Sequence, residues 1–255
     1  MIAYFSGTGN SRYVARRLAG VLDEDTLFMT GCDPRAITFK GRTFGLVFPV
    51  YSWGVPPLVT DFIKSLSEDF VSGLREAKTP VWAVMTCGDE TGDAPEILKA
   101  SLEIRGLRLA GVWSVIMPNT YVLLPGFDVD PTEVELRKIE EAPARVDAIA
   151  SSIKSGKFVA DVHFGSMPRL KTRLIFPIFR HAGIFPSWWR FTEECVSCGK
   201  CAAVCPVGNV EMVAGHPRWH ADCVSCLACY HACPVHAVAY GIMTGGKGQY
   251  HCKLH

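Results

Sequence analysis

The sequence CVSCGKCAAVCP, at residues 195–206, is followed by a second copy of its cysteine pattern, CVSCLACYHACP, at residues 223–234. In each copy three cysteines stand three positions apart, a fourth comes four positions later, and a proline follows it. Three thiolates on one tight loop can reach three irons of a cubane cluster, whereas the fourth lies a helical turn further on and faces a different cube. A zinc ion needs only four ligands, usually from two Cys-x-x-Cys pairs. The repeat therefore predicts two [4Fe-4S] clusters.

This spacing resembles that of the bacterial two-cluster ferredoxins, in which the fourth cysteine of each run ligates the other cluster. The resemblance implies a small α+β ferredoxin-like domain over residues 191–255. One cluster is then assigned to Cys195, Cys198, Cys201 and Cys233, and the other to Cys223, Cys226, Cys229 and Cys205. No role is assigned to Cys32, Cys87 and Cys252.

Upstream of the cysteines, short apolar runs alternate with helical patterns. Continuous apolar runs are typical of strands buried on both faces of a parallel sheet. They occur at residues 44–49 and 81–86, and residues 2–5 and 109–117 are predicted to be strands as well. The alternation predicts a doubly wound α/β fold with a parallel sheet.

Two helices are expected between and after these strands. The first spans residues 11–22 and has one apolar face, made of Val14, Leu18, Val21 and Leu22. The second spans residues 131–154, with Asp130 as its N-cap, Pro131 at its first position and a kink at Pro143.

A glycine- and hydroxyl-rich loop, Ser6-Gly7-Thr8-Gly9-Asn10-Ser11, joins the first strand to the first helix. It is neither the dinucleotide-binding G-x-G-x-x-G nor a Walker loop, since no Gly-Lys-Ser/Thr follows. Its glycines let backbone N–H groups close around an anion, and the helix N-terminus adds a partial positive charge. The loop indicates a phosphate site built from neutral donors, with a plain tight turn as the alternative.

Two further loops follow predicted strands, Pro49-Val50-Tyr51-Ser52-Trp53-Gly54 and Thr86-Cys87-Gly88-Asp89. Ligands of such sheets lie at the carboxyl ends of the strands, where all three loops are expected. Together the loops resemble those of the flavodoxins, and the resemblance implies an FMN site. Tyr51 or Trp53 would stack on the flavin ring, unless both pack in the core, and no tyrosine comes shortly after Asp89 to cover the second face. The implied FMN-binding residues are Ser6, Thr8, Gly9, Asn10, Ser11, Pro49, Val50, Tyr51, Ser52, Trp53, Gly54, Thr86, Cys87, Gly88 and Asp89.

Between the flavodoxin-like residues 1–156 and the cysteine domain lies a basic, aromatic segment, residues 157–190. Asp161 is its single acidic residue, against Lys157, Arg169, Lys171, Arg173, Arg180 and Arg190. One interpretation is a connector that packs against both domains. The other is a partly exposed surface for an acidic redox partner or for lipid headgroups.

A flavodoxin-like half followed by a two-cluster ferredoxin half resembles the EFR-type flavodoxin–ferredoxin fusion proteins of anaerobic bacteria and archaea. The resemblance implies electron transfer between the clusters and FMN, with a ferredoxin-type donor or a reductase as partner. A second hypothesis is an FMN-dependent reductase of a small organic acceptor (a quinone, enone or nitro compound), recharged through its clusters. Its proton donor would come from Asp89, Glu90, Asp93, Asn119 and Tyr121. A weaker third hypothesis is a redox sensor.

Composition limits the classes of partner and the cellular locations expected for the 255-residue chain. A formal charge of +1 does not favour nucleic-acid binding. No apolar run reaches the roughly 18–20 residues of a membrane span, and no basic leader precedes an apolar stretch at the N-terminus. We expect a cytoplasmic protein without a transmembrane segment, in which weak contact with a membrane surface stays open.

Overall fold

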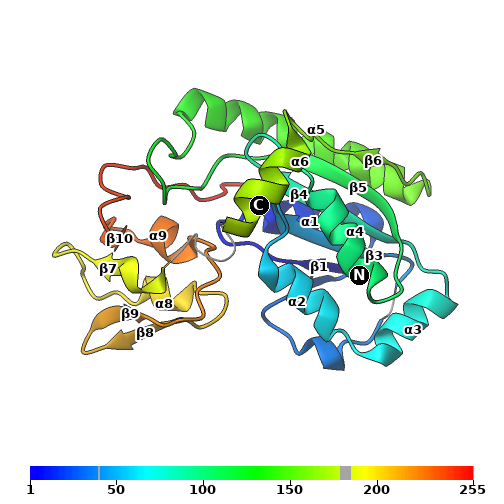
Figure 1. Ribbon diagram of the computed structural model, residues 1–255, viewed down its shortest axis with the longest axis horizontal. Helices are drawn as coiled ribbons and strands as arrows, with labels where there is room; N and C mark the ends of the chain where they lie inside the picture. Colours follow the sequence, from blue (N-terminus) through cyan, green and yellow to red (C-terminus); the bar gives the residue numbers. More distant parts are fainter. Residues whose placement is uncertain (40, 179–184, 255) are drawn as a thin grey trace.

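A computed structural model describes residues 1–39, 41–178 and 185–254. Its larger domain is built on a six-stranded sheet in the order β2-β1-β3-β4-β5-β6, with every neighbouring pair parallel (Figure 1). The order 2-1-3-4-5 is that of the flavodoxin-like doubly wound fold, which confirms the expected fold class. The strands are β1 (Ile2–Tyr4), β2 (Thr26–Phe28), β3 (Phe44–Pro49), β4 (Val81–Cys87), β5 (Leu109–Ile116) and β6 (Ala160–Asp161).

Each face of the sheet has its own apolar core, because successive strand residues point to opposite sides. Ile2 and Tyr4 pack with α1 (Asn10–Leu22) and α5 (Thr132–Lys154). Ala3 and Phe5 pack on the other side, against α2 (Pro57–Ser65), α3 (Glu68–Glu76) and α4 (Ala94–Glu103). A short 3-10 turn, η1 (Pro34–Ala36), follows β2.

Two details of the helices differ from expectation. Val21 is 40% exposed, so the buried face of α1 is completed by other residues, including Ala15 and Ala19. The N-cap of α5 is Pro131, and the Asp130 carboxylate instead accepts from the Asn119 backbone N–H and pairs with Lys138. The helix continues through Pro143, which has no N–H to donate to the preceding turn.

The segment expected as a connector contributes to the larger domain. It supplies β6, which pairs with β5 at the edge of the sheet. A helix over residues 168–178 follows, made of α6 (Pro168–Leu170), the π-helical η2 (Lys171–Ile175) and one further turn. Arg180 of the expected basic set lies outside the described residues.

The smaller domain holds both cysteine runs and two short antiparallel sheets, β7 with β10 and β8 with β9. Its apolar core includes several of the cysteines together with Val122 and Leu123 from the larger domain. Its elements are η3 (Pro186–Trp188), β7 (Trp189–Phe191), α8 (Lys200–Ala203), β8 (Val210–Val213), β9 (His216–Trp219), α9 (Ala228–Ala232) and β10 (Val238–Tyr240).

The C-terminal tail returns from the smaller domain to the larger one. The Tyr250 hydroxyl donates to Asn10 Oδ1 at 2.7 Å, and the Cys252 N–H donates to the Thr8 carbonyl at 3.0 Å. Beside the tail, His231 donates from Nε2 to the Thr120 carbonyl at 2.8 Å and accepts the Tyr250 N–H at Nδ1. Burial lowers the pKa of His231 to about 4, so its neutral ring can both donate and accept. These bonds fix the two domains against each other.

None of the helices in the described residues is both long and apolar enough to cross a bilayer.

Candidate redox site

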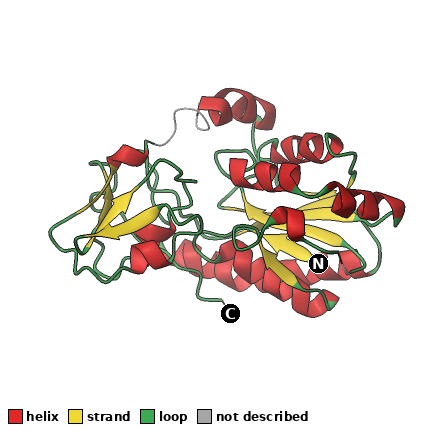
Figure 2. Cartoon of the chain, turned by 90° about the horizontal axis from the view of Figure 1, so that it is seen from below, coloured by secondary structure: helices red, strands yellow, loops and turns green. Residues whose placement is uncertain are grey.

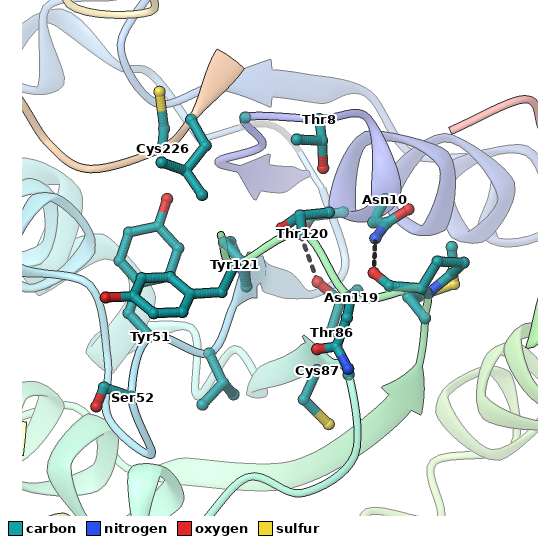
Figure 3. A pocket seen from close by; sticks show the side chains of 18 of the residues that line it. Thr8, Asn10, Tyr51, Ser52, Thr86, Cys87, Asn119, Thr120, Tyr121 and Cys226 are labelled. Carbon is teal, nitrogen blue, oxygen red and sulfur yellow. Dashed lines mark hydrogen bonds between the residues drawn. The ribbon is translucent and has the colours of Figure 1, made fainter. Parts of the chain in front are cut away.

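The three loops singled out in the sequence surround one cavity of about 540 Å³, at the carboxyl ends of the parallel strands. Figure 3 shows Thr8, Tyr51, Cys87 and Cys226 around this space, each from a different part of the chain. Of the expected FMN-binding residues, those lining the cavity are Ser6, Thr8, Asn10, Ser11, Pro49, Val50, Tyr51, Ser52, Trp53, Thr86, Cys87, Gly88 and Asp89. Gly9 and Gly54 are not among the lining residues, and a Cβ at these positions would crowd Cys252 and Phe176 respectively.

The glycine-rich loop is held by its own side chains. Ser6 Oγ accepts the Gly9 N–H at 3.1 Å, and Ser11 Oγ lies 2.7 Å from the Thr86 hydroxyl. The Asn10 amide donates to the Pro118 carbonyl at 3.0 Å while its oxygen accepts from Tyr250. Thr8, only 6% exposed, lines the cavity at the N-terminus of α1. The first N–H groups of a helix point outward along its axis, so this corner suits an anion.

The second loop makes a tight turn that fixes Trp53. Tyr51 and Gly54 exchange both backbone hydrogen bonds, and Ser52 and Trp53 between them have positive φ values of 46° and 62°. Such conformations in residues other than glycine store strain and are enriched at functional sites. The Trp53 indole N–H donates to Glu90 at 2.6 Å, and Lys171 pairs with the same carboxylate while lying 5.3 Å from the indole ring.

The Tyr51 phenol and the Cys87 thiol stay protonated at neutral pH. Burial, reinforced by the neighbouring Cys226 and Cys223, raises the pKa of Tyr51 well above its usual value. Burial also raises the pKa of Cys87 to about 12, with a smaller contribution from Asp89. Cys87 is therefore a poor nucleophile at neutral pH.

The polar wall of the cavity is built around a buried ion pair. Lys138, 5% exposed, lies 2.7 Å from Asp130 and 3.7 Å from Asp89. The Asn119 amide donates to both carboxylates, at 3.2 Å to Asp130 and 3.3 Å to Asp89. Of the proton donors considered in the sequence, Asp89, Glu90, Asn119 and Tyr121 line the cavity, whereas Asp93 lies outside its lining, at the start of α4.

Several lining residues were not predicted. Met117, Pro118 and Thr120 directly follow β5, and the same rule that pointed to the other loops could have indicated them. Leu124, Phe127 and Ile175 give one side of the cavity apolar walls. Three further lining residues that were not predicted come from the smaller domain: Ser225, Cys226 and Leu227. No feature of the sequence places them at the cavity.

The eight clustered cysteines fall into two groups of four. Cys195, Cys198, Cys201 and Cys233 line one small pocket. Cys205 lies near Cys223, Cys226 and Cys229: burial is the main reason that the pKa of each of these three thiols is raised, and the nearby Cys205 adds to the rise. The grouping is the one that the ferredoxin rule assigns. In the described part of the chain, no group of three or more His, Cys, Asp or Glu side chains is close enough together to hold a single metal ion.

Hydrogen-bond donors surround these sulfurs. The Asn209 N–H donates to Cys205 Sγ at 3.2 Å, and the Ala237 N–H makes the equivalent bond to Cys233 Sγ at 3.1 Å. The Trp219 indole N–H lies 3.5 Å from Cys229 Sγ. Burial raises the pKa of Cys229 to about 12. Binding iron there has to offset the cost of a buried thiolate, and N–H···S bonds lower that cost.

The second cysteine loop is packed against the loop at the head of the cavity. A Cβ at Gly7 would overlap the carbonyl oxygen of Cys226, so only glycine permits this approach. Val224 and Cys226 also pack against the apolar core of the larger domain. A cysteine of the second group, Cys226, therefore lies beside the expected flavin site.

Comparison with known proteins agrees with the cysteine domain. Residues 194–238 match the family described as 4Fe-4S dicluster domain. No curated protein matches the chain. Among solved structures, it is similar to the Trp repressor binding protein from Bacillus subtilis, with 14% identity and a TM-score of 0.38 over 57% of this chain and 95% of that one. It is also similar to an FMN-dependent NADH-azoreductase from Bacillus anthracis str. Ames Ancestor in complex with FMN. The identity is 12% and the TM-score 0.33, over 58% of this chain and 98% of that one.

The fold and the family match together define the class. The chain is an iron–sulfur redox protein in which a dicluster domain is joined to a domain of flavodoxin-like fold.

Proposed function

We propose that this protein is an electron carrier of the EFR type, which passes electrons between two [4Fe-4S] clusters and FMN. It would link a low-potential one-electron donor, such as a ferredoxin-type protein or a reductase, to a flavin acceptor. One observation carries the proposal: Cys226 lines the same cavity as the three flavodoxin-like loops. A cluster held there would lie next to the flavin without any need for diffusion between separate carriers.

The residues of the cavity fit FMN. Its volume of about 540 Å³ is in the range of small-molecule sites. Thr8, Ser11 and the start of α1 would hold the phosphate, while Tyr51 and Trp53 would flank the ring. When bound, FMN would store two electrons and two protons, whereas each cluster passes one electron at a time.

The two cysteine groups fit an electron relay. Cys198 is the exposed cysteine of the first group, whereas Cys226 of the second group lines the cavity. The first cluster would therefore meet an external partner, and the second would exchange electrons with the flavin. Trp219 and the backbone N–H groups around the sulfurs would tune the potentials of the clusters.

Anaerobic purification followed by iron, sulfide and flavin analysis tests the cofactor content. We expect about eight irons and eight sulfides per chain, with one FMN. Stoichiometric zinc without acid-labile sulfide would contradict the clusters. Thr8→Asp should abolish FMN retention while leaving the clusters intact, because it adds a like charge at the phosphate. Ser151→Asp, on the exposed side of α5, is the matched control. Equal FMN content in Thr8→Asp and the parent would place the phosphate elsewhere.

A second candidate function is reduction of a small organic acceptor by the flavin. It is favoured by the apolar side of the cavity, where Leu124, Phe127 and Ile175 are 45%, 46% and 43% exposed. A quinone, enone or nitro compound could approach through this side, next to the polar Asp89 and Asn119. Mixing the reduced holoprotein anaerobically with each class of acceptor and analysing the products separates an enzyme from a carrier.

A further inference from the structure

The helix over residues 168–178 has one face packed on the larger domain. Thr172 is 6% exposed, donates through its hydroxyl to the Trp53 carbonyl at 2.7 Å and accepts the Asp93 N–H at 2.8 Å. Phe176, 7% exposed, lies against Gly54. Lys171 pairs with Glu90. These contacts hold the helix in one orientation.

The opposite face of this helix is apolar and exposed. Met167, Leu170, Leu174 and Ile178, here called the apolar stripe, are 64%, 51%, 58% and 66% exposed. Three of them are four residues apart, a spacing that aligns side chains along one side of a helix. Single exposed apolar residues are ordinary, but an aligned row marks an interaction surface. The helix stands at the upper edge of the molecule in Figure 2, outside the layers of the larger domain.

The charged residues that the helix itself places next to the apolar stripe are basic, whereas the acidic Glu90 contacts the helix from the larger domain through Lys171. Arg169 and Arg173 lie beside it and are exposed. Residues 162–192 contain no Asp or Glu, although the chain has 25 acidic residues in all. Lys171 is already paired with Glu90 and Arg190 belongs to β7 of the smaller domain, so in the described part of this segment Arg169 and Arg173 are the exposed charges next to the stripe.

We infer that this helix docks the protein on an anionic lipid surface. The apolar stripe would lie between the headgroups, and Arg169 and Arg173 would reach the lipid phosphates, as in other interfacial amphipathic helices. A second copy of the chain fits less well, because a symmetric contact would bring the arginines of both helices together without acids between them. A protein partner is also disfavoured, since the stripe lacks the aromatic anchors that are enriched at such interfaces.

The docked orientation would place the expected flavin cavity near the membrane, because Ile175 of the same helix lines it. This consequence rests on the proposed function, and it favours a lipid-soluble acceptor. The docking itself depends only on the apolar stripe and its arginines, so the two proposals can fail separately.

Vesicle co-sedimentation of the anaerobically purified holoprotein tests the inference. The probes are vesicles of phosphatidylcholine alone and of phosphatidylcholine with phosphatidylglycerol. We expect binding to the anionic vesicles, weakened by added salt. Leu170→Asn/Leu174→Asn and Arg169→Gln/Arg173→Gln should each weaken partitioning roughly tenfold or more. Ile104→Asn, which replaces a residue 76% exposed elsewhere on the surface, is the control and should bind as the parent does.

Retention of cluster and flavin absorbance shows that each variant is folded. Absence of parent binding to anionic vesicles would overturn the inference, as would equal binding by parent and stripe variants. A parent that forms dimers lost in the stripe variants would assign the surface to self-association instead. Electron transfer from cluster to flavin, measured without vesicles, should be the same in the variants as in the parent. If the parent itself shows no such transfer, the proposed function is contradicted and the docking inference is not.

Discussion

The two cysteine loops begin with the same four residues but lie in different surroundings. In the first loop Val196 is 60% exposed and Cys198 is also exposed. In the second, the equivalent Val224 packs against the core of the larger domain, and Cys226 lines the cavity. The motif predicts that each loop holds a cluster, whereas the packing decides which of the two loops lies beside the proposed flavin site. Two copies of one sequence can therefore serve as an outer and an inner redox centre.

The largest effect should come from removing the fourth cysteine of each run in turn. Cys205→Ala would remove a proposed ligand of the second cluster, and Cys233→Ala would remove the corresponding proposed ligand of the first. Flavin reduction by a small low-potential donor should slow markedly in Cys205→Ala, because the inner centre is lost. It should persist in Cys233→Ala, since a small donor can bypass the outer centre. Stopped-flow absorbance measures the rate of flavin reduction in the two variants, and iron analysis confirms which cluster is lost. Equal rates of flavin reduction in the two variants would contradict the assignment of an inner and an outer loop.

A smaller effect is expected when the contact between the second loop and the larger domain is strained. Gly7→Ala places a Cβ against the Cys226 carbonyl and should lower stability by about 1–3 kcal/mol, as overpacking does. Gly20→Ala, in α1 with open space around it, should instead stabilise by about 0.5–1 kcal/mol. Anaerobic denaturant unfolding measures both changes. A tolerated Gly7→Ala would show that the second loop does not rest on this glycine.

The smallest effect concerns Glu90, which joins Trp53 to the helix over residues 168–178. Burial acts to raise the pKa of Glu90, but hydrogen bonds from Lys171 and Trp53 outweigh it and leave the pKa lowered. The pair therefore contributes stability above the unfolded pKa of about 4.5, and this contribution is lost as pH falls through the folded pKa.

Glu90→Gln should reproduce that loss at neutral pH, without exposing the clusters to acid. It should destabilise by no more than about 1 kcal/mol, because the pair is partly exposed. Proteolysis within residues 163–178 should also become faster. Glu141→Gln, on the exposed side of α5, is the control. An unchanged proteolysis rate in Glu90→Gln would mean that the carboxylate does not anchor this helix.

The sequence anticipated what local patterns determine. The apolar runs at residues 44–49 and 81–86 are strands, and the three loops after strands meet at one cavity. The short β2 and β6 were missed because three and two residues carry too little periodicity. Asp130 was misassigned as a cap because its partners, Asn119 and Lys138, come from outside the turn it was expected to cap.

Contacts between domains could not be derived in this way. Nothing in the sequence of Ser225, Cys226 and Leu227 distinguishes them from a loop in a free ferredoxin. Their place in the cavity depends on the C-terminal tail, which bonds to Thr8 and Asn10 from the far end of the chain. Gly7 is the residue in the larger domain that permits this contact. The sequence alone does not show that a Cβ is excluded there, because the atom it would overlap belongs to Cys226.

The central claim is that the second cluster delivers electrons to the flavin within one molecule. Its most direct test is the rate of transfer from cluster to flavin after rapid partial reduction, followed anaerobically by stopped-flow absorbance over a tenfold dilution of the protein. The docked second loop predicts a first-order rate that does not change with dilution. A rate that falls in proportion to protein concentration would contradict the claim, because electrons would then be passing between separate molecules.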